Sequence, residues 1–150
     1  MENINRIIFA SGNGTSRAPM ATAIFQSMPH NRQIICEARG LLVQFPEPLN
    51  QKADAVLISN GIELKDFSSK QLVESDFSEN TLVITMEESA RLKIINEYAN
   101  ATEENTRLLN ELVGDELEVM NPYGGSVQSY GLCYEILKVS IEKLMKVLNA

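Results

Sequence analysis

The sequence predicts one α/β domain over residues 1–150, built as a sandwich of parallel strands and helices. Short apolar runs rich in β-branched residues alternate with stretches of helical periodicity, which is the pattern of successive parallel β/α units. The length of 150 residues suits a single compact domain. Neither an internal repeat nor a change of composition marks a second domain.

The chain opens with a strand, a polar loop and a helix. Ile4–Ala10 is a short apolar run that predicts a buried strand. Ser11–Arg17 follows as a loop with two glycines, an asparagine and several hydroxyl groups. A helix is predicted from Ala18, since Pro19 then stands near the first helical position, where proline is tolerated. A second strand is predicted over Gln33–Ala38.

The middle of the chain predicts a further helix, strand and helix. Phe45–Pro48 is typical of a stiff extended linker, because each residue before a proline is pushed out of the helical region. The next helix is expected to begin at the N-cap Asn50 and to end at Gly61. Thr81–Thr85 predicts a buried strand, and Glu87–Ala99 predicts an amphipathic helix with acidic residues in its first turn.

The last third of the chain predicts a turn and a long final helix. Arg107–Val113 fits a helix or a strand, and Asn121–Gly125 predicts a turn. The final helix is expected over Val127–Leu148. Its apolar stripe is predicted at Leu132, Ile136, Val139 and Val147, interrupted by Lys143.

Composition and charge argue against several classes of protein. With 13 basic and 20 acidic side chains the net charge is −7, which disfavours broad binding to nucleic acid or to a membrane surface. No uncharged apolar run is long enough to span a bilayer, and the first residues do not resemble a signal peptide. Cys36 and Cys133 are far apart within apolar patterns, so we expect buried reduced thiols and a cytoplasmic location. His30 has no partners at ligand spacing, so neither a metal nor another cofactor is predicted.

The Ser11–Arg17 loop has the parts of an anion-binding site. Glycines let backbone amides converge, the following helix presents the positive end of its dipole, and Arg17 supplies a planar fork for phosphate oxygens. The loop is neither a Walker loop nor a dinucleotide-binding fingerprint. From the loop alone, an ordinary glycine turn with a surface arginine is the alternative.

Four short motifs occur in an order and spacing that match a known family. They are Arg17-Ala18-Pro19-Met20-Ala21, Asn60-Gly61-Ile62, Leu82-Val83-Ile84-Thr85-Met86 and Asn121-Pro122-Tyr123-Gly124. These resemble Arg-Ser-Pro-Met-Ala, Gly-Ile, Leu-Ile-Leu-Thr-Met and Asp-Pro-Tyr of the low-molecular-weight protein tyrosine phosphatases. The resemblance covers essentially the whole chain. It implies a three-layer sandwich with a four-stranded parallel sheet flanked by helices, and a phosphate loop after the first strand.

The chain departs from this family at the residues that react. The family's loop is Cys-x-Gly-Asn-x-Cys-Arg; its first cysteine attacks phosphorus, and the aspartic acid of Asp-Pro protonates the leaving group. By the resemblance, Ser11 stands at the nucleophile position and Asn121 at the general-acid position. A serine hydroxyl stays protonated without a base, and an amide cannot give up a proton. Ala18 replaces a serine that bonds the thiolate, and Ser16 replaces the second cysteine.

The parts of the loop that bind an anion remain. The resemblance implies that Arg17 grips two phosphate oxygens, that the amides of residues 12–17 hold the rest, and that Ser11 lies beneath the phosphorus. Tyr123 is expected to line the substrate cleft, and Tyr130 is a second candidate for it. The expected phosphate-binding residues are Ser11, Gly12, Asn13, Gly14, Thr15, Ser16 and Arg17.

These observations suggest a degenerate member, a pseudophosphatase, with little or no hydrolytic activity. It would bind phosphate, another oxyanion or a phosphotyrosine-containing protein. One alternative is a working phosphatase that uses Ser11 or another group, or one that was inactivated by engineering. An arsenate-reductase-like protein is a minor alternative, because neither Cys36 nor Cys133 falls where that relay needs a cysteine. The acidic pairs Glu87-Glu88 and Glu103-Glu104 are interpreted as solvated helix starts.

Overall fold

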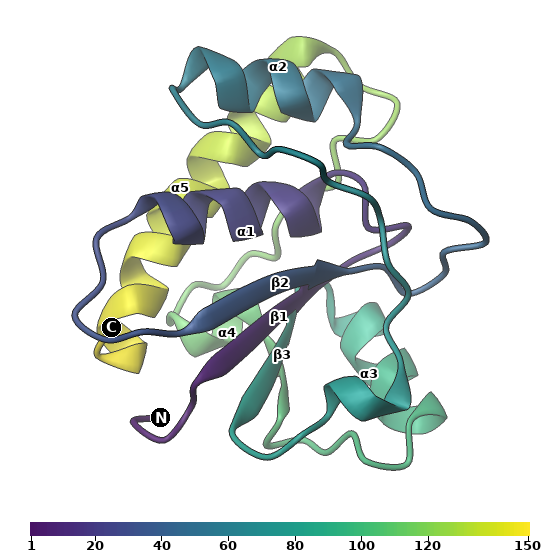
Figure 1. Ribbon diagram of the computed structural model, residues 1–150, viewed down its shortest axis with the longest axis vertical. Coiled ribbons are helices and arrows are strands. Elements are labelled where there is room, and N and C mark those ends of the chain that lie inside the picture. The colour runs from purple at the N-terminus through teal and green to yellow at the C-terminus, as the bar shows by residue number, and fades with distance from the viewer.

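The computed structural model describes all residues from Met1 to Ala150, and Figure 1 shows a central sheet between helices. The sheet has four parallel strands, as predicted, and their order is β2-β1-β3-β4. In chain order the elements are β1 (Arg6–Ala10), α1 (Arg17–Ser27), β2 (Ile35–Arg39), α2 (Gln51–Ser59), the 3₁₀ turn η1 (Glu74–Asp76), β3 (Thr81–Thr85), α3 (Glu88–Glu97), β4 (Thr106–Leu108), α4 (Leu109–Leu112) and α5 (Val127–Leu148).

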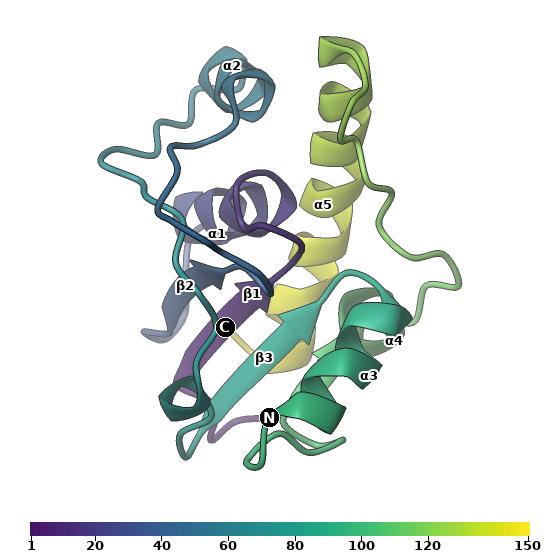
Figure 2. The ribbon, with the colours of Figure 1, turned by 90° about the vertical axis from the view of Figure 1, so that its right-hand side faces the viewer.

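Helices cover both faces of the sheet. Helices α1 and α5 lie on one face, with α2 packed outside them, and α3 lies on the other (Figure 2). Alternate residues of β1 supply the two cores, because successive side chains of a strand point to opposite faces. Ile7 and Phe9 belong to the larger core beneath α1 and α5, while Ile8 and Ala10 face Ile94 of α3. None of the helices is long and apolar enough to cross a membrane.

The segment over Arg107–Val113, which fitted a helix or a strand, divides between the two. Residues Thr106–Leu108 form β4 beside β3, and the chain then turns directly into the short helix α4. The other predicted strands and helices are present at the expected positions, with ends that differ by no more than two residues.

The predicted apolar stripe of α5 is wrong as the buried face. The side chains of Leu132, Val139 and Val147 are 55%, 51% and 42% exposed, and Lys143 pairs with Asp115 on the surface. A second stripe contacts the core because α1 and α2 both pack against that side of the helix. Its members are Tyr130, Cys133, Tyr134, Leu137, Ile141, Leu144, Met145 and Leu148.

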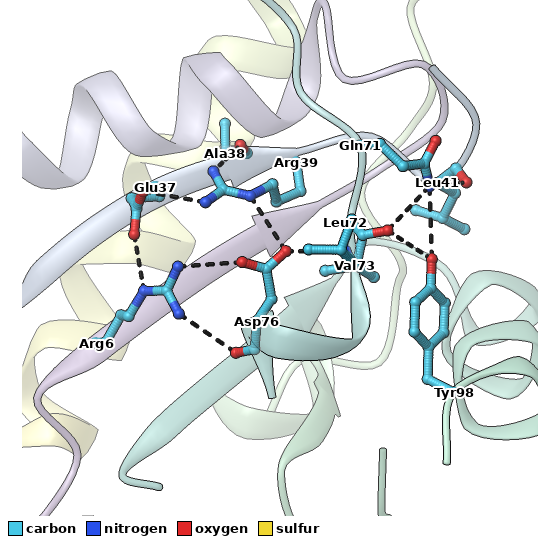
Figure 3. Close-up of polar contacts among 10 residues, drawn as sticks. All are labelled: Arg6, Glu37, Ala38, Arg39, Leu41, Gln71, Leu72, Val73, Asp76 and Tyr98. Carbon is cyan, nitrogen blue, oxygen red and sulfur yellow. Dashed lines mark hydrogen bonds and ion pairs between the residues drawn. The ribbon is translucent and has the colours of Figure 1, made fainter. Parts of the chain in front are cut away.

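A ring of ion pairs joins β1, β2 and η1 on the face of the sheet that α3 covers (Figure 3). Arg6 contacts Glu37 at 2.7 Å and Asp76 at 3.1 Å. Arg39 contacts the same two acids, Glu37 at 3.1 Å and Asp76 at 3.3 Å. Asp76 also accepts a hydrogen bond from the amide of Val73 at 3.0 Å. The ring therefore fastens the connection before β3 to the ends of β1 and β2.

We predict that Asp76→Asn lowers the free energy of unfolding at pH 7 by about 3 kcal/mol or more. The Asp76 side chain is 6% exposed and serves two arginines, so its loss leaves buried positive charge without compensation. Chemical denaturation measures the difference.

Glu37→Gln is the matched control in the same ring. The Glu37 side chain is 35% exposed, so its loss should cost less than about 1 kcal/mol. Burial raises the pKa of Glu37, but hydrogen bonds and attraction from Arg6 and Arg39 outweigh this and hold that pKa below its ordinary value of 4.5. Its contribution should therefore be present above pH 4.5 and lost as the pH falls further. If Asp76→Asn and Glu37→Gln lower the free energy of unfolding equally at pH 7, Asp76 does not act as a buried charge.

Candidate functional site

A hollow of about 240 Å³ lies where the chain leaves β1 and enters α1. This is the carboxyl edge of the parallel sheet, where open α/β folds bind their ligands. Residues more than a hundred positions apart meet there, since the Ser11–Arg17 loop forms one side and the turn at Asn121 the other. The lining residues are Ser11, Gly12, Asn13, Ser16, Arg17, Asn121 and Tyr123.

The loop bends sharply at two glycines, Gly12 with φ +36° and Gly14 with φ +75°. These are conformations that residues with a Cβ rarely adopt. A Cβ on Gly14 would also lie 2.8 Å from the backbone nitrogen of Gly40. Gly14 is therefore required both for its dihedral angles and for the close approach of the loop to the end of β2.

The backbone amides of the loop divide into two groups. The Gly14 amide donates to the Ser11 carbonyl at 2.8 Å, and the Thr15 amide donates to Asn13 Oδ1 at 3.2 Å. These two amides, which were expected to hold an anion, shape the loop in this structure. The amides that find no acceptor within the chain are those of Gly12, Asn13, Ser16 and Arg17.

Ser11 lies at the floor of the hollow and is 4% exposed. Its Oγ accepts a hydrogen bond from the amide of Ala18 at 3.1 Å, at the N-terminal end of α1. Such a donor stabilises negative charge on the oxygen, but it removes no proton from the hydroxyl. The only histidine, His30, packs its ring against Phe25 beyond the other end of α1. No histidine therefore serves Ser11 as a base.

Arg17 is 4% exposed and is fixed by two contacts. Its Nη1 donates to the Val119 carbonyl at 3.1 Å, and its Nη2 donates to Glu87 Oε1 at 2.8 Å. Glu87 follows β3 at the carboxyl edge of the sheet, so it orients the guanidinium and offsets part of its charge. The sequence interpretation of Glu87 as a solvated helix start missed this pair. The signal that could have found it was an acidic residue directly after a central parallel strand.

Asn121 approaches the hollow from the turn before α5. Its Oδ1 accepts the amide of Tyr123 at 3.1 Å, and its Nδ2 makes no hydrogen bond within the chain, so two N–H groups remain as donors beside the hollow. Tyr123 is 76% exposed beside the hollow. Tyr130, the second candidate for the cleft, is instead 1% exposed in the core, with the Lys52 ammonium 6.0 Å from the centre of its ring.

The two cysteines are buried and unreactive by their surroundings. Burial raises the pKa of the Cys133 thiol to about 11, against the opposing attraction of Arg17. Burial likewise raises the pKa of Cys36, on β2, well above its ordinary value. Neither thiol lines the hollow, and no cluster of three or more metal-binding side chains occurs in the chain. Both thiols are therefore protonated at neutral pH, so neither supplies a thiolate.

Comparisons with known proteins agree with this architecture. Residues 6–150 match the family described as low molecular weight phosphotyrosine protein phosphatase. The chain is 26% identical to the low molecular weight protein-tyrosine-phosphatase PtpB of Staphylococcus epidermidis, covering 93% of this chain and 96% of that protein. It is 28% identical to the protein-arginine-phosphatase of Bacillus subtilis, covering 95% and 96%. A solved structure of YwlE arginine phosphatase, a Cys-to-Ser mutant with a phosphorylated active-site serine, is similar with a TM-score of 0.86 and 26% identity, covering 96% of this chain and 95% of that one.

We predict that Gly14→Ala lowers the free energy of unfolding by more than about 2 kcal/mol, because it adds a steric clash to left-handed strain. Gly114→Ala is the matched control, since Gly114 has φ +79° but nothing within 4 Å of its Cβ position. That variant should lose only the strain, about 1 kcal/mol. Urea denaturation of both proteins gives the two values. If they coincide, the contact between Gly14 and Gly40 does not constrain the loop.

Proposed function

The chain belongs to the low molecular weight phosphotyrosine protein phosphatase family, and we propose that it binds phosphate or a phosphorylated ligand while hydrolysing it slowly or not at all. One observation carries the proposal. The hollow retains donors that can bind an anion, whereas two of its lining residues, Ser11 and Asn121, lack the reactive groups of the family.

The donors suit a tetrahedral oxyanion. The free amides of the Ser11–Arg17 loop, the N-terminus of α1 and the guanidinium of Arg17 all border one small hollow. Arg17 stays oriented by Glu87 and the Val119 carbonyl, so little side-chain entropy is lost on binding. This arrangement supports binding of a dianion by a protein whose net charge is −7.

The same site lacks what turnover needs. A phosphoryl group can be transferred efficiently only to an activated nucleophile. Ser11 has no thiol, and no carboxylate or histidine lines the hollow to act as its general base. Asn121 can donate a hydrogen bond to a leaving oxygen, but it can neither give up a proton to it nor take one from water. These absences weigh against the alternative of an active phosphatase, and the burial of both thiols weighs against an arsenate-reductase-like relay.

Relatives suggest two classes of ligand. Proteins similar to this chain include a protein-tyrosine-phosphatase and a protein-arginine-phosphatase. We therefore propose phosphotyrosine or phosphoarginine side chains of cytoplasmic proteins as ligands. The exposed ring of Tyr123, at the rim of the hollow, offers a flat apolar surface to either group.

We expect inorganic phosphate, phosphotyrosine or phosphoarginine to bind in calorimetric titration, with at most trace release of phosphate over hours. Arg17→Ala should weaken binding by about 100-fold, since two charge-assisted hydrogen bonds are lost. Arg91→Ala is the control, because Arg91 pairs with Glu88 away from the hollow. Rapid turnover by the unaltered protein that is abolished in Arg17→Ala would refute the proposal and establish an active phosphatase.

Restoring the family's reactive groups is the complementary test. Ser11→Cys combined with Asn121→Asp should hydrolyse an aryl phosphate at least about 100-fold faster than the unaltered protein, because it regains a nucleophile and a general acid. Each single change should restore less. A double variant that binds phosphate but remains inert would show that more than these two groups is missing.

A second candidate function is that of a phosphoryl acceptor. The similar YwlE mutant carries a phosphorylated serine in its active site. In such a transfer to this chain, the bond from Ser11 Oγ to phosphorus would form while the P–O or P–N bond to the leaving group breaks. The hydroxyl proton would pass to the leaving group. The resulting phosphoserine would persist, because Asn121 cannot activate water against it.

Intact mass spectrometry after incubation with phosphoarginine or an aryl phosphate checks this candidate. We expect a mass increase of one phosphoryl group, absent in Ser11→Ala and retained in Ser59→Ala, a control at a serine outside the hollow. An unmodified protein that still binds phosphate would reject the acceptor role and leave the binding role intact.

A further inference from the structure

The aim of the anion-binding amides depends on a peptide group whose oxygen is held away from the hollow. The Gly12 carbonyl accepts the amides of Leu41 at 2.7 Å and Leu42 at 3.2 Å. In a planar trans peptide the carbonyl and the next N–H point in opposite directions. Fixing the Gly12 oxygen against Leu41 and Leu42 therefore turns the Asn13 N–H the other way, and Asn13 lines the hollow.

The turn that holds this oxygen directly follows β2. The end of β2 also contacts the loop directly, because the Arg39 carbonyl accepts a hydrogen bond from the amide of Ser11 at 3.2 Å. Gly40 is pressed between the loop and the turn, since a Cβ there would lie 2.7 Å from the Asn13 backbone and 2.5 Å from Val43 Cγ2. The turn and the loop are therefore packed so closely that a change in the conformation of the turn would displace the loop.

One side chain closes this turn from the other side. Gln71 Oε1 accepts the amide of Val43 at 2.7 Å, and Gln71 Nε2 donates to the Leu41 carbonyl at 2.8 Å. Figure 3 shows Gln71 between Leu41 and the segment at Leu72, where Tyr98 also bonds. Gln71 itself is placed by backbone bonds between Gly40 and its own neighbours, from the Gly40 amide to Lys70 at 2.8 Å and from the Leu72 amide to Gly40 at 2.9 Å.

We infer that Gln71 is a positioning residue for oxyanion binding: by clamping the turn over residues 41–43, it holds the Gly12 carbonyl outward and the Asn13 amide inward. It does not line the hollow. Loss of the clamp lets the peptide between Gly12 and Asn13 rotate, and its carbonyl oxygen then repels the anion. The inference rests on the proposed function, because it explains how this site is organised before a ligand arrives.

The test compares two variants of the same segment. Gln71→Met keeps the length of the side chain but removes both bonds to the turn. Tyr98→Phe is the control, because it removes the 2.8 Å bond from Tyr98 Oη to the Leu72 carbonyl and the 3.5 Å bond that Tyr98 Oη accepts from Gln71 Nε2, but leaves both bonds from Gln71 to the turn in place. We expect Gln71→Met to raise the Kd for inorganic phosphate about tenfold, the loss of about one well-aimed hydrogen bond. Tyr98→Phe should change that Kd by less than about twofold. Both variants should lower the thermal stability by a similar amount.

Amide hydrogen exchange provides a readout that does not need a ligand. In Gln71→Met the amides of Leu41 and Leu42 should exchange faster, whereas those of β1 should not. Unchanged exchange and unchanged Kd would overturn the inference, as would an equal rise of Kd in Tyr98→Phe. If the unaltered protein fails to bind phosphate, the proposed function fails. Faster exchange at Leu41 and Leu42 in that case would still establish the clamp, and unchanged exchange would reject it.

Discussion

Gly14 and Gly40 are in close contact at the carboxyl edge of the sheet, and neither position has room for a Cβ. This close approach lets a loop that leaves β1 rest directly on the end of β2, the neighbouring strand. Because β1 and β2 are parallel, both strands end at the same edge of the sheet. The backbone of the loop after β1 can therefore pack against the backbone that follows β2. The curvature of the loop, the aim of its free amides and the floor at Ser11 all depend on that support.

The proposed anion binding by an acidic protein depends on how charge is distributed around the hollow. Arg17 keeps one acidic partner, Glu87, at the edge of the hollow, where the pair is oriented but still faces the ligand. A second buried arginine, Arg39 on β2, is committed to Glu37 and Asp76 on the face of the sheet that α3 covers. The two arginines therefore have separate tasks: one holds the scaffold together, and the other is left to meet a ligand.

The sequence predicted the sheet, its helices and the position of the loop, because local periodicity and glycine placement encode them. It did not predict the relations that depend on packing between distant segments. Glu87 was interpreted as a solvated residue because its pairing with Arg17 exists only once β1 and β3 are adjacent. The buried face of α5 was misassigned because the helix carries two apolar stripes, and only contact with α1 and α2 decides between them. Gln71 gave no signal, since a polar residue in a connecting segment looks the same whether it clamps a turn or faces water.

Binding and chemistry are separable in this site because different atoms carry them. The contacts that shape the loop use the backbone of Ser11, Gly12 and Gly14 and the side chain of Asn13, and none requires a thiol at position 11 or a carboxyl group at position 121. Under the proposed function, exchange of the reactive side chains would leave the anion site intact, with the Ala18 amide bonded to Ser11 Oγ at its base. A site assembled mainly from side chains would have lost binding together with reactivity. Here the retained backbone geometry, with Arg17 held in place by Glu87, makes a protein that recognises phosphate without consuming it a physically consistent outcome.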